Sequence, residues 1–482
     1  MSRLITFKYK QLSQLLERFF YSDFYITRLS VIAIAAFFLR LEIYAIFFLA
    51  FIIAINLIFV KDVLPTFLPL LLIGMVPLAR YGEVSYFYPV LLYALIFMIP
   101  AMLLRAFIYP VKFKIGRFFY PTLAVSSSIV LGGLFAISLE DYFALRSIYY
   151  VIGLGPFMVL VYFALETYLP KDNHYMAMYF AKIMTAIGVM GIAMYWGSIA
   201  LNQHLVDEQF PRSLFQWRNN VSNNLLLSMP FAFYLGLKHR YPGIYFTIGI
   251  LQFVTLIFLF SRGGMISAAI VFPFIMAATI FISNGRKYIL VIDFIIVMAL
   301  IYFVFEWKIA PWSEIIQTMI SRLRVSDTES RAMMYRYAVE LFFKYPLFGT
   351  GLGYDVVYYN PQPMAMFWYH STFFQIVGSL GLFGIVAYGY QMVVRGYTLL
   401  EEISRFSIFV ALSIFGFALY SMVNVGYFIP LPFGPVVLGM FIILERYSHM
   451  IKTNRHLRKK ERLFKYYRIR PFIFIKDSES DK

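Results

Sequence analysis

The sequence contains no cysteine and few charged residues. Without a Cys among its 482 residues, the chain can form no disulfide bond and offers no thiolate to bind a metal or attack a substrate. Charged residues make up 14% of the chain, whereas soluble domains carry roughly 25%. The first twenty residues also lack the short apolar core and small-residue cleavage site of a signal peptide, so we expect no removable signal.

Hydrophobic residues are correspondingly abundant in the sequence. They make up 61% of the sequence, and the mean hydropathy is +0.73. Since a membrane-spanning helix needs about 20 mostly apolar residues, these stretches predict an all-α, polytopic helical membrane protein with about 12–14 transmembrane helices. The predicted spans are residues 24–39, 42–60, 63–79, 85–105, 118–137, 145–168, 175–199, 221–237, 242–260, 264–283, 288–305, 370–394, 406–424 and 430–445.

Basic residues gather in alternate loops, which sets the predicted orientation. The loops rich in Lys or Arg are 105–117, 237–243, 284–287 and 395–405. Such loops face the cytoplasm in membrane proteins. We therefore predict a cytoplasmic N-terminal segment at 1–23, a transmembrane domain at 24–445 and a basic cytoplasmic tail at 446–482.

The basic tail accounts for much of the net charge of +17. Because it directly follows an apolar segment, we expect it to bind the anionic lipids of the membrane surface. We expect no nucleic-acid partner.

One loop on the predicted extracytoplasmic side, residues 306–369, is far longer than a connector. Within it, the stretch SDTESRAMMYRYAVELFFKYP (326–346) places its apolar residues at helical spacing and ends in proline. This pattern predicts an amphipathic helix that lies against the membrane domain. Arg331 falls near its start, where the helix dipole also favours an anion.

Three short stretches contain candidate functional residues. In FSRGG (260–264), Arg262 interrupts a strongly apolar region, so it either snorkels to the membrane edge or faces a polar cavity. In PLFGTGLG (346–353), the glycines indicate a structural turn or a close approach of backbone to a ligand. His370 lies at the start of the next predicted span. It is either a polar residue that caps this helix or a catalytic group.

The order of these stretches resembles the O-antigen ligase and O-antigen polymerase family of bacterial membrane glycosyltransferases. The shared pattern comprises SRGG after an apolar helix, an arginine opening a helix that ends in YPLFGTGLG, and HSTFFQIVGSLGLFG from His370. The stretch WRNNVSNNLLLSMP (217–230) is similar to the Asn-containing segment of the family. The chain departs from the pattern at Tyr335, Ser371 and Ser379, where members often carry Trp, Asn and an acid.

The resemblance implies glycosyl transfer, without a metal or other cofactor, from a polyprenyl-diphosphate-linked oligosaccharide to a glycan acceptor. The reaction would take place at the outer face of the bacterial cytoplasmic (inner) membrane. Arginine suits the departing diphosphate because its planar donor fork matches phosphate oxygens. A histidine kept neutral by nearby arginines suits the base that accepts the proton of the attacking hydroxyl. We therefore predict Arg262, Arg331 and His370 as catalytic residues.

Further residues are predicted to bind substrate beside Arg262 and Arg331. The list comprises Arg322, Arg324, Asn220, Asn224, Gly351 and Gly353. The asparagines could equally cap a helix, and Asp207 with Glu208 is the one attractive pair for an alternative metal-dependent route.

Within the family, polymerase and ligase differ in the acceptor. The large number of predicted spans favours a polymerase, which joins lipid-linked repeat units in O-antigen, capsule or other surface-polysaccharide synthesis and can work with a chain-length regulator. The alternatives are a ligase, which moves the finished glycan to a terminal acceptor, and a flippase for lipid-linked oligosaccharides. A flippase would carry charges at mid-membrane and two related halves.

Overall fold

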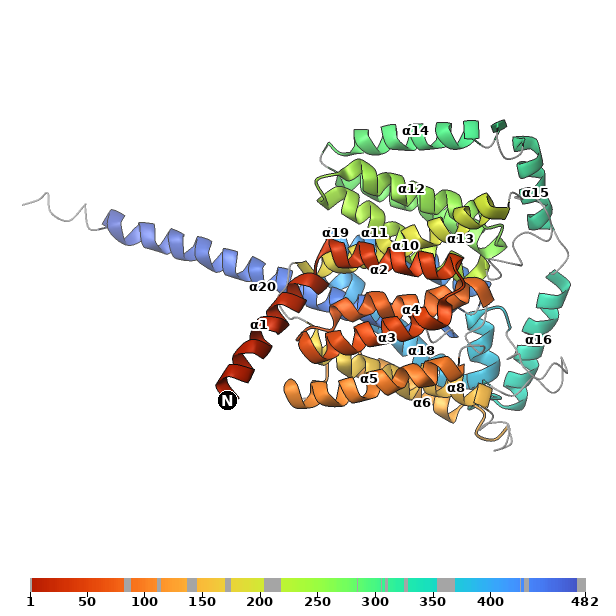
Figure 1. Cartoon of the computed structure of the whole chain (residues 1–482), viewed down its shortest axis with the longest axis horizontal. Coiled ribbons are helices and arrows are strands. Elements are labelled where there is room, and N and C mark those ends of the chain that lie inside the picture. The colour runs from red at the N-terminus through yellow and green to blue at the C-terminus, as the bar shows by residue number, and fades with distance from the viewer. Residues whose placement is uncertain are drawn as a thin grey trace, which may run out of the picture.

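The computed structural model describes the chain apart from thirteen short segments and the first residue. These undescribed residues are 1, 82–87, 111–113, 137–144, 170–174, 203–217, 284, 305, 308–310, 325–327, 353–368, 425, 429–432 and 475–482. Every regular element in the described part is helical, which confirms the predicted all-α fold (Figure 1).

Most helices lie side by side in one bundle. Its first half contains α2 (Asp23–Phe38), α3 (Glu42–Phe59), α4 (Phe67–Tyr81), α5 (Tyr88–Ile108), α6 (Phe119–Leu131), α8 (Leu145–Leu154), α9 (Pro156–Tyr168) and α10 (Tyr175–Asn202). Its second half contains α11 (Arg218–Lys238), α12 (Pro242–Phe258), α13 (Arg262–Ile282), α14 (Lys287–Val304), α18 (Thr372–Glu401), α19 (Arg405–Met422) and α20 (Phe433–Phe474).

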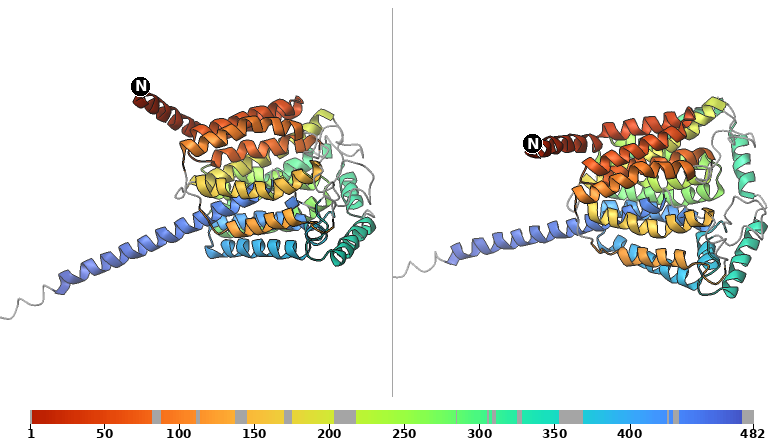
Figure 2. Two further views of the ribbon diagram at one scale, coloured as in Figure 1. Left: turned by 90° about the horizontal axis from the view of Figure 1, so that it is seen from below. Right: turned by 60° about the horizontal axis from the view of Figure 1, so that its bottom comes forward.

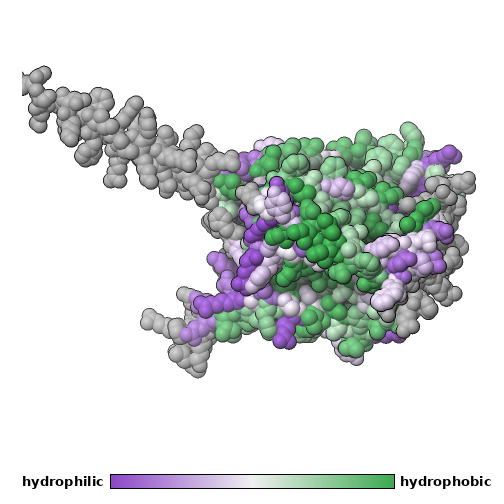
Figure 3. Space-filling model, turned by 90° about the horizontal axis from the view of Figure 1, so that it is seen from above, coloured by the Kyte–Doolittle hydropathy of each residue, from purple (hydrophilic) through white to green (hydrophobic). Residues whose placement is uncertain are grey.

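The two ends of the bundle differ. At one end, which we call the terminal end, α1 (Ser2–Phe20) and the long α20 project away from the bundle (Figures 1 and 2). Across the other end, which we call the cavity end, lie α15 (Trp312–Arg324) and α16 (Thr328–Lys344) (Figure 1). Hydrophobic residues dominate the face between the two ends, and hydrophilic residues gather toward them (Figure 3).

The lengths and composition of the helices confirm a polytopic membrane protein. Among the described residues, seven helices are long and apolar enough to cross a membrane, and the bent pair Gln11–Phe20 and Asp23–Phe38, with 64° between its halves, would make an eighth. This count is below the predicted 12–14 because several predicted spans form shorter helices, such as α6 with 13 residues and α12 with 17. Residues 24–39 belong to the bent pair.

The structure adds detail to four other predictions. The span predicted at 145–168 is confirmed at Tyr150–Tyr168, which is long and apolar enough to cross a membrane, and a break at Gly155 before Pro156 divides it between α8 and α9. The outer loop contains α15 in addition to the predicted amphipathic helix, which is confirmed as α16. Residues 2–20, for which no helix was predicted, form α1. The predicted start of the tail at 446 falls inside α20, which is one continuous helix.

Helix α11 forms the centre of the bundle. Nearly all of its side chains from Asn220 to Leu237 are buried, and it packs against α10, α12, α13 and α19. It is too polar to pass as an apolar span, yet it is the most enclosed helix of the protein. Polar residues are tolerated there because protein, and not lipid, surrounds them.

Helix α18 is broken inside the bundle at Gly381. This residue has φ 62° and ψ −156°, which is outside the helical region. The segment after α16 pairs with both sides of the break: the N–H groups of Thr350 and Gly351 donate to Gly378 and Ser379 at 3.0 and 2.8 Å. In the other direction, the N–H groups of Leu382 and Phe383 donate to Pro346 and Leu347 at 2.8 and 3.0 Å.

The glycines of PLFGTGLG therefore serve this pairing. Gly349 has φ +62°, and a Cβ there would lie 2.4 Å from the carbonyl carbon of Ser379. A Cβ on Gly351 would lie 3.0 Å from the carbonyl oxygen of Gly132. Of the two alternatives for this stretch, the described residues support the structural turn.

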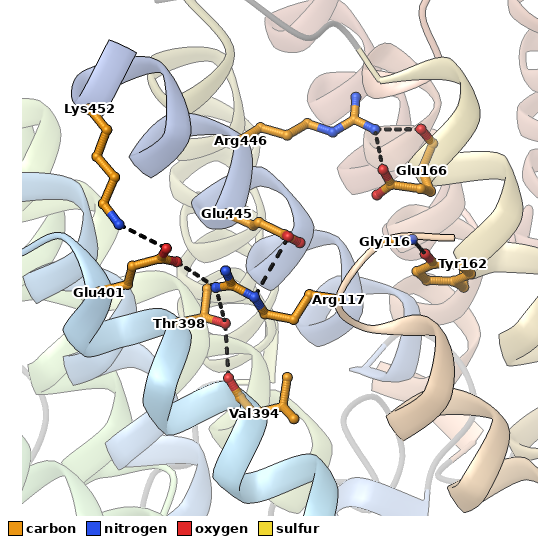
Figure 4. Close-up of polar contacts among 10 residues, drawn as sticks. All are labelled: Gly116, Arg117, Tyr162, Glu166, Val394, Thr398, Glu401, Glu445, Arg446 and Lys452. Atoms are coloured by element: carbon orange, nitrogen blue, oxygen red, sulfur yellow. Dashed lines mark hydrogen bonds and ion pairs between the residues drawn. The ribbon is translucent and has the colours of Figure 1, made fainter. Parts of the chain in front are cut away.

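The terminal end is held by ion pairs and by arginines that cap helices. Glu401 of α18 accepts from Arg117, and from Lys452 Nζ of α20 at 2.8 Å, while Arg446 pairs with Glu166 of α9 at 3.4 Å (Figure 4). Arg446 also donates to the backbone oxygen of Leu169 at the end of α9. A cation at this position satisfies carbonyls that the helix leaves unpaired.

Replacing Gly349 with alanine is expected to destabilise the protein by about 2 kcal/mol or more, since the new Cβ meets backbone and the φ is unfavourable. Thermal unfolding of the purified protein in detergent measures this. Gly389→Ala in α18 is the matched control, because its Cβ meets nothing within 4 Å. It should be neutral or stabilising by up to about 1 kcal/mol. Equal unfolding temperatures for the two variants would contradict the role assigned to Gly349.

Candidate functional site

A polar cavity of about 310 Å³ opens at the cavity end. Helices α11, α13, α16 and α19, the turn between α12 and α13, the residues just after α19, and His370, which lies two residues before α18, contribute to its lining. The lining residues are Arg218, Asn219, Phe260, Ser261, Arg262, Gly263, Arg331, His370, Tyr420, Val423 and Asn424. The three residues predicted to be catalytic, which lie up to 108 positions apart in the chain, thus face one space.

Three arginines line this cavity from three helices. Arg218 is the first residue of α11, Arg262 is the first residue of α13, and Arg331 lies in the first turn of α16. Their positions bring positive side chains together with the positive ends of helix dipoles. Such an arrangement attracts an anion strongly, above all one with several oxygens such as a diphosphate.

His370 is held in an unusual backbone conformation. Its φ is +50°, a value that costs a residue other than glycine about 1–3 kcal/mol unless its surroundings impose it. On one side, the N–H of Tyr369 donates to Gln375 Oε1 at 3.1 Å. On the other side, the N–H of Thr372 donates to the carbonyl oxygen of Asn424 at 3.1 Å. The histidine is therefore fixed between two anchored neighbours.

A second strained residue borders the cavity. Phe260, in the turn from α12 to α13, also has φ +50°. For a bulky side chain this is a clear outlier. Two of the three positive-φ residues other than glycine in the described part of the chain thus line one cavity, and strain of this kind concentrates at functional sites.

The glycines beside Arg262 have a packing role. A Cβ on Gly263 would lie 2.7 Å from Cγ2 of Val423, and one on Gly264 would lie 2.6 Å from Oγ of Ser222. These glycines let the start of α13 approach α19 and α11 closely. This close packing of α13 against α11 and α19 positions Arg262, the first residue of α13, at the cavity.

A hydrogen-bonded network connects the helices around the arginines. Ser261 Oγ donates to Asn219 Oδ1 at 2.8 Å, and the hydroxyl of Tyr420 donates to the carbonyl oxygen of Asn219 at 3.1 Å. Asn424 Nδ2 donates to the Tyr420 hydroxyl at 2.7 Å. Since Asn424 also anchors Thr372, one network positions α11, α13, α19 and the His370 turn.

Of the other predicted site residues, the structure places three, Asn220, Asn224 and Gly351, away from the cavity lining. Asn220 and Asn224 are buried inside the bundle, 2% and 5% exposed, and do not line the cavity. Gly351 packs against Gly132. Gly353 lies outside the described residues, as do the side chains of Arg322 and Arg324, whose backbone belongs to α15. The substrate-binding role of these residues stays a prediction.

Several lining residues were not predicted from the sequence, among them Arg218, Tyr420 and Asn424. Arg218, like Arg262, is an arginine at the outer end of a predicted span. Tyr420 and Asn424 carried no signal, because a tyrosine in an apolar span and an asparagine after it are ordinary. Only the packing of α19 against α11 and α13 brings them to the cavity.

Two of the three departures from the family pattern, Tyr335 and Ser379, make specific contacts in the structure. Tyr335 stacks on Phe374, with ring centroids 4.2 Å apart and an interplanar angle of 9°. Burial raises the pKa of the Tyr335 phenol, and the nearby Arg331 charge opposes this shift. Ser379 accepts from Gln375 Nε2 at 3.0 Å, so it orients the amide that holds Tyr369.

No group of three His, Cys, Asp or Glu side chains suited to a metal occurs in the part of the chain that the structure describes. Asp207 and Glu208, the alternative metal pair, lie outside that part. The independence from metal stays a prediction.

Comparison with known families gives one match. Residues 247–389 match the family described as O-antigen ligase. This segment contains Arg262, Arg331 and His370, and therefore the whole predicted catalytic set. Neither a curated protein nor a solved structure matches the chain.

We expect inorganic diphosphate to bind the cavity and to raise the unfolding temperature of the purified protein, because anion binding relieves the repulsion among the arginines. Arg262→Gln and Arg331→Gln should each reduce this stabilisation. Arg240→Gln is the control, since Arg240 is exposed at the end of α11 away from the cavity and stacks on Tyr241. A diphosphate effect that all four proteins share would contradict the assignment of the site.

Proposed function

We propose, on the match of residues 247–389 to the O-antigen ligase family, that the protein polymerises polyprenyl-diphosphate-linked oligosaccharide repeat units. The reaction is a metal-independent glycosyl transfer at the outer face of the bacterial cytoplasmic membrane. The observation that carries this proposal is the convergence of three arginines and one strained histidine on one polar cavity.

The arginines suit the departure of a lipid diphosphate. When the bond between the anomeric carbon and the diphosphate oxygen breaks, negative charge grows on the leaving group. Arg262 and Arg331 meet this charge with planar donor forks, and Arg218 adds a third. Because these cations are fixed before the reaction, they stabilise the transition state without further reorganisation.

His370 suits the activation of the acceptor. A hydroxyl oxygen of the acceptor glycan attacks the anomeric carbon and forms the new glycosidic bond. Its proton passes to the neutral imidazole, while the electron pair of the broken bond leaves with the diphosphate. This role requires an imidazole that is neutral before the reaction, so that a ring nitrogen can accept the proton.

The arrangement of charge supports the side of the membrane. The basic residues that cap helices or pair with acids at the terminal end belong to the loops and to the tail predicted to face the cytoplasm: Arg286 to loop 284–287, and Arg446 and Lys452 to the tail. The cavity opens at the opposite end, so a lipid-linked glycan would reach it from the extracytoplasmic face.

A ligase reaction is the second candidate. The matched family is described as O-antigen ligase, and the same cavity would serve the transfer of a finished glycan to a terminal acceptor. The two reactions share the donor and the chemistry, and they differ in what brings the acceptor hydroxyl to His370.

Arg262→Gln is expected to lower the rate of glycan transfer about 100- to 1000-fold, as the loss of one fixed transition-state donor typically does. Arg262→Lys keeps the charge but loses the donor fork, so its rate should lie between those of Arg262→Gln and wild type. A transfer assay with purified protein and synthetic lipid-linked repeat units measures both. A rate unchanged by Arg262→Gln would exclude the arginine from catalysis.

Rescue of cells that lack the protein tests His370 and separates the candidates. With His370→Ala, a polymerase should leave single repeat units on the lipid carrier, as mass spectrometry of lipid-linked glycans would show. A ligase would instead leave long chains stranded on the lipid. His449→Ala, an exposed histidine on α20, should restore normal glycans. Normal glycans without any copy of the protein would overturn the enzymatic function.

Gln375→Met tests the positioning of His370. The variant removes the acceptor for the buried Tyr369 N–H, so transfer should slow while binding of inorganic diphosphate stays as in wild type. Phe373→Ala, an exposed neighbour on the same helix, is the control for both measurements. If Gln375→Met lost diphosphate binding and transfer in equal measure, the glutamine would stabilise the fold in general and would not position the histidine.

A further inference from the structure

A buried arginine lies in the second half of α18, far from the cavity described above. Arg395 is only 8% exposed and precedes Glu401 by six residues, so it lies about 9 Å along the helix from the polar cluster of the terminal end. A charge at this depth is costly unless it has a partner or a function.

Arg395 borders a second cavity, of about 50 Å³, in the interior of the bundle. Thr122 of α6, Met158 of α9 and Val437 of α20 line it, together with Tyr427 from the short helix η4 (Gly426–Phe428). The guanidinium carbon of Arg395 lies 5.5 Å from the ring centroid of Tyr427. The connection after α19 therefore enters the bundle and brings this tyrosine beside the arginine.

Several buried polar atoms at this cavity have no acceptor in good hydrogen-bond geometry, although Arg395 and Tyr427 lie close enough to interact with each other. These atoms are Nη1 of Arg395, the hydroxyl of Tyr427 and the hydroxyl of Thr122. Buried polar groups are nearly always hydrogen-bonded, and each one left without a partner costs about 1–3 kcal/mol. Three such donors around one space indicate that an acceptor belongs there.

The cavity also lacks a balancing negative charge. None of the described residues that line it is Asp or Glu. A buried cation without a counter-ion is strongly destabilising, so the missing acceptor is best supplied by an anion. A single arginine balances one negative charge, which favours a monovalent anion over phosphate.

We propose that this cavity is a binding site for a monatomic anion, with chloride as its occupant. The volume exceeds the roughly 10–15 Å³ that one water molecule needs, but it is far below the 310 Å³ of the outer cavity. The ion accepts hydrogen bonds from Arg395, Tyr427 and Thr122. It thereby joins α6, α18 and η4 and neutralises the one cation of this space.

Binding of radiolabelled chloride to the purified full-length protein tests the proposal. The outer arginines could also attract chloride, so the assay uses Arg262→Gln/Arg331→Gln as its starting protein. This protein should retain saturable chloride binding, which bromide displaces and gluconate, being too large, does not. Adding Arg395→Met should abolish the saturable binding.

Thr122→Val provides a variant that keeps the fold, because valine has nearly the shape of threonine. It removes one donor, so the chloride concentration for half-saturation should rise about fivefold. Thr279→Val is the matched control, since Thr279 is equally buried but donates to Ile275 O within α13. It should leave chloride binding unchanged. The proposal is overturned if the starting protein binds no chloride, or if Thr122→Val and Thr279→Val bind it equally well.

Discussion

A helix that breaks inside a membrane must have its freed backbone groups satisfied by protein, because lipid offers no hydrogen bonds. The break at Gly381 imposes this constraint on α18. The segment after α16 meets it by pairing with the carbonyls before the break and the N–H groups after it. This pairing fixes the end of α16 against the middle of α18. It thereby sets the distance between Arg331 at the start of α16 and His370 before α18.

The arginines of the two ends occupy opposite electrostatic positions. At the terminal end, three arginines donate to carbonyl oxygens at the C-terminal ends of helices: Arg105 at α3, Arg286 at α11 and Arg446 at α9. The helix dipole stabilises a cation at such a position. At the cavity end, Arg218 and Arg262 stand at helix starts, where the dipole opposes them. An anion bound in the cavity relieves this conflict. The proposed diphosphate-linked donor would therefore gain affinity from an arrangement that costs the empty protein some stability.

The sequence predicts the helices well because bilayer thickness and apolar length are tightly linked. It also predicts α16, whose apolar residues recur at helical spacing, and the meeting of Arg262, Arg331 and His370 in one site. It could not predict the break in α18, because Gly381 is one of several glycines in an apolar run and only its pairing with residues 346–351 distinguishes it. Nor could it reveal Tyr420 and Asn424, whose importance comes from contacts between distant helices.

The lining of the cavity includes residues outside the segment that matches the family. Arg262, Arg331 and His370 lie within residues 247–389, but Arg218, Tyr420 and Asn424 lie outside them. Arg218 is the first residue of α11, Tyr420 lies in the last turn of α19 and Asn424 lies just after that helix. Hydrogen bonds of Tyr420 and Asn424 connect α11, α19 and the turn that follows His370. Since α11 is the buried centre of the bundle, the position of each catalytic candidate depends on how the whole membrane domain packs around it. A change in that packing, even far from the cavity, therefore also changes the geometry of the candidate site.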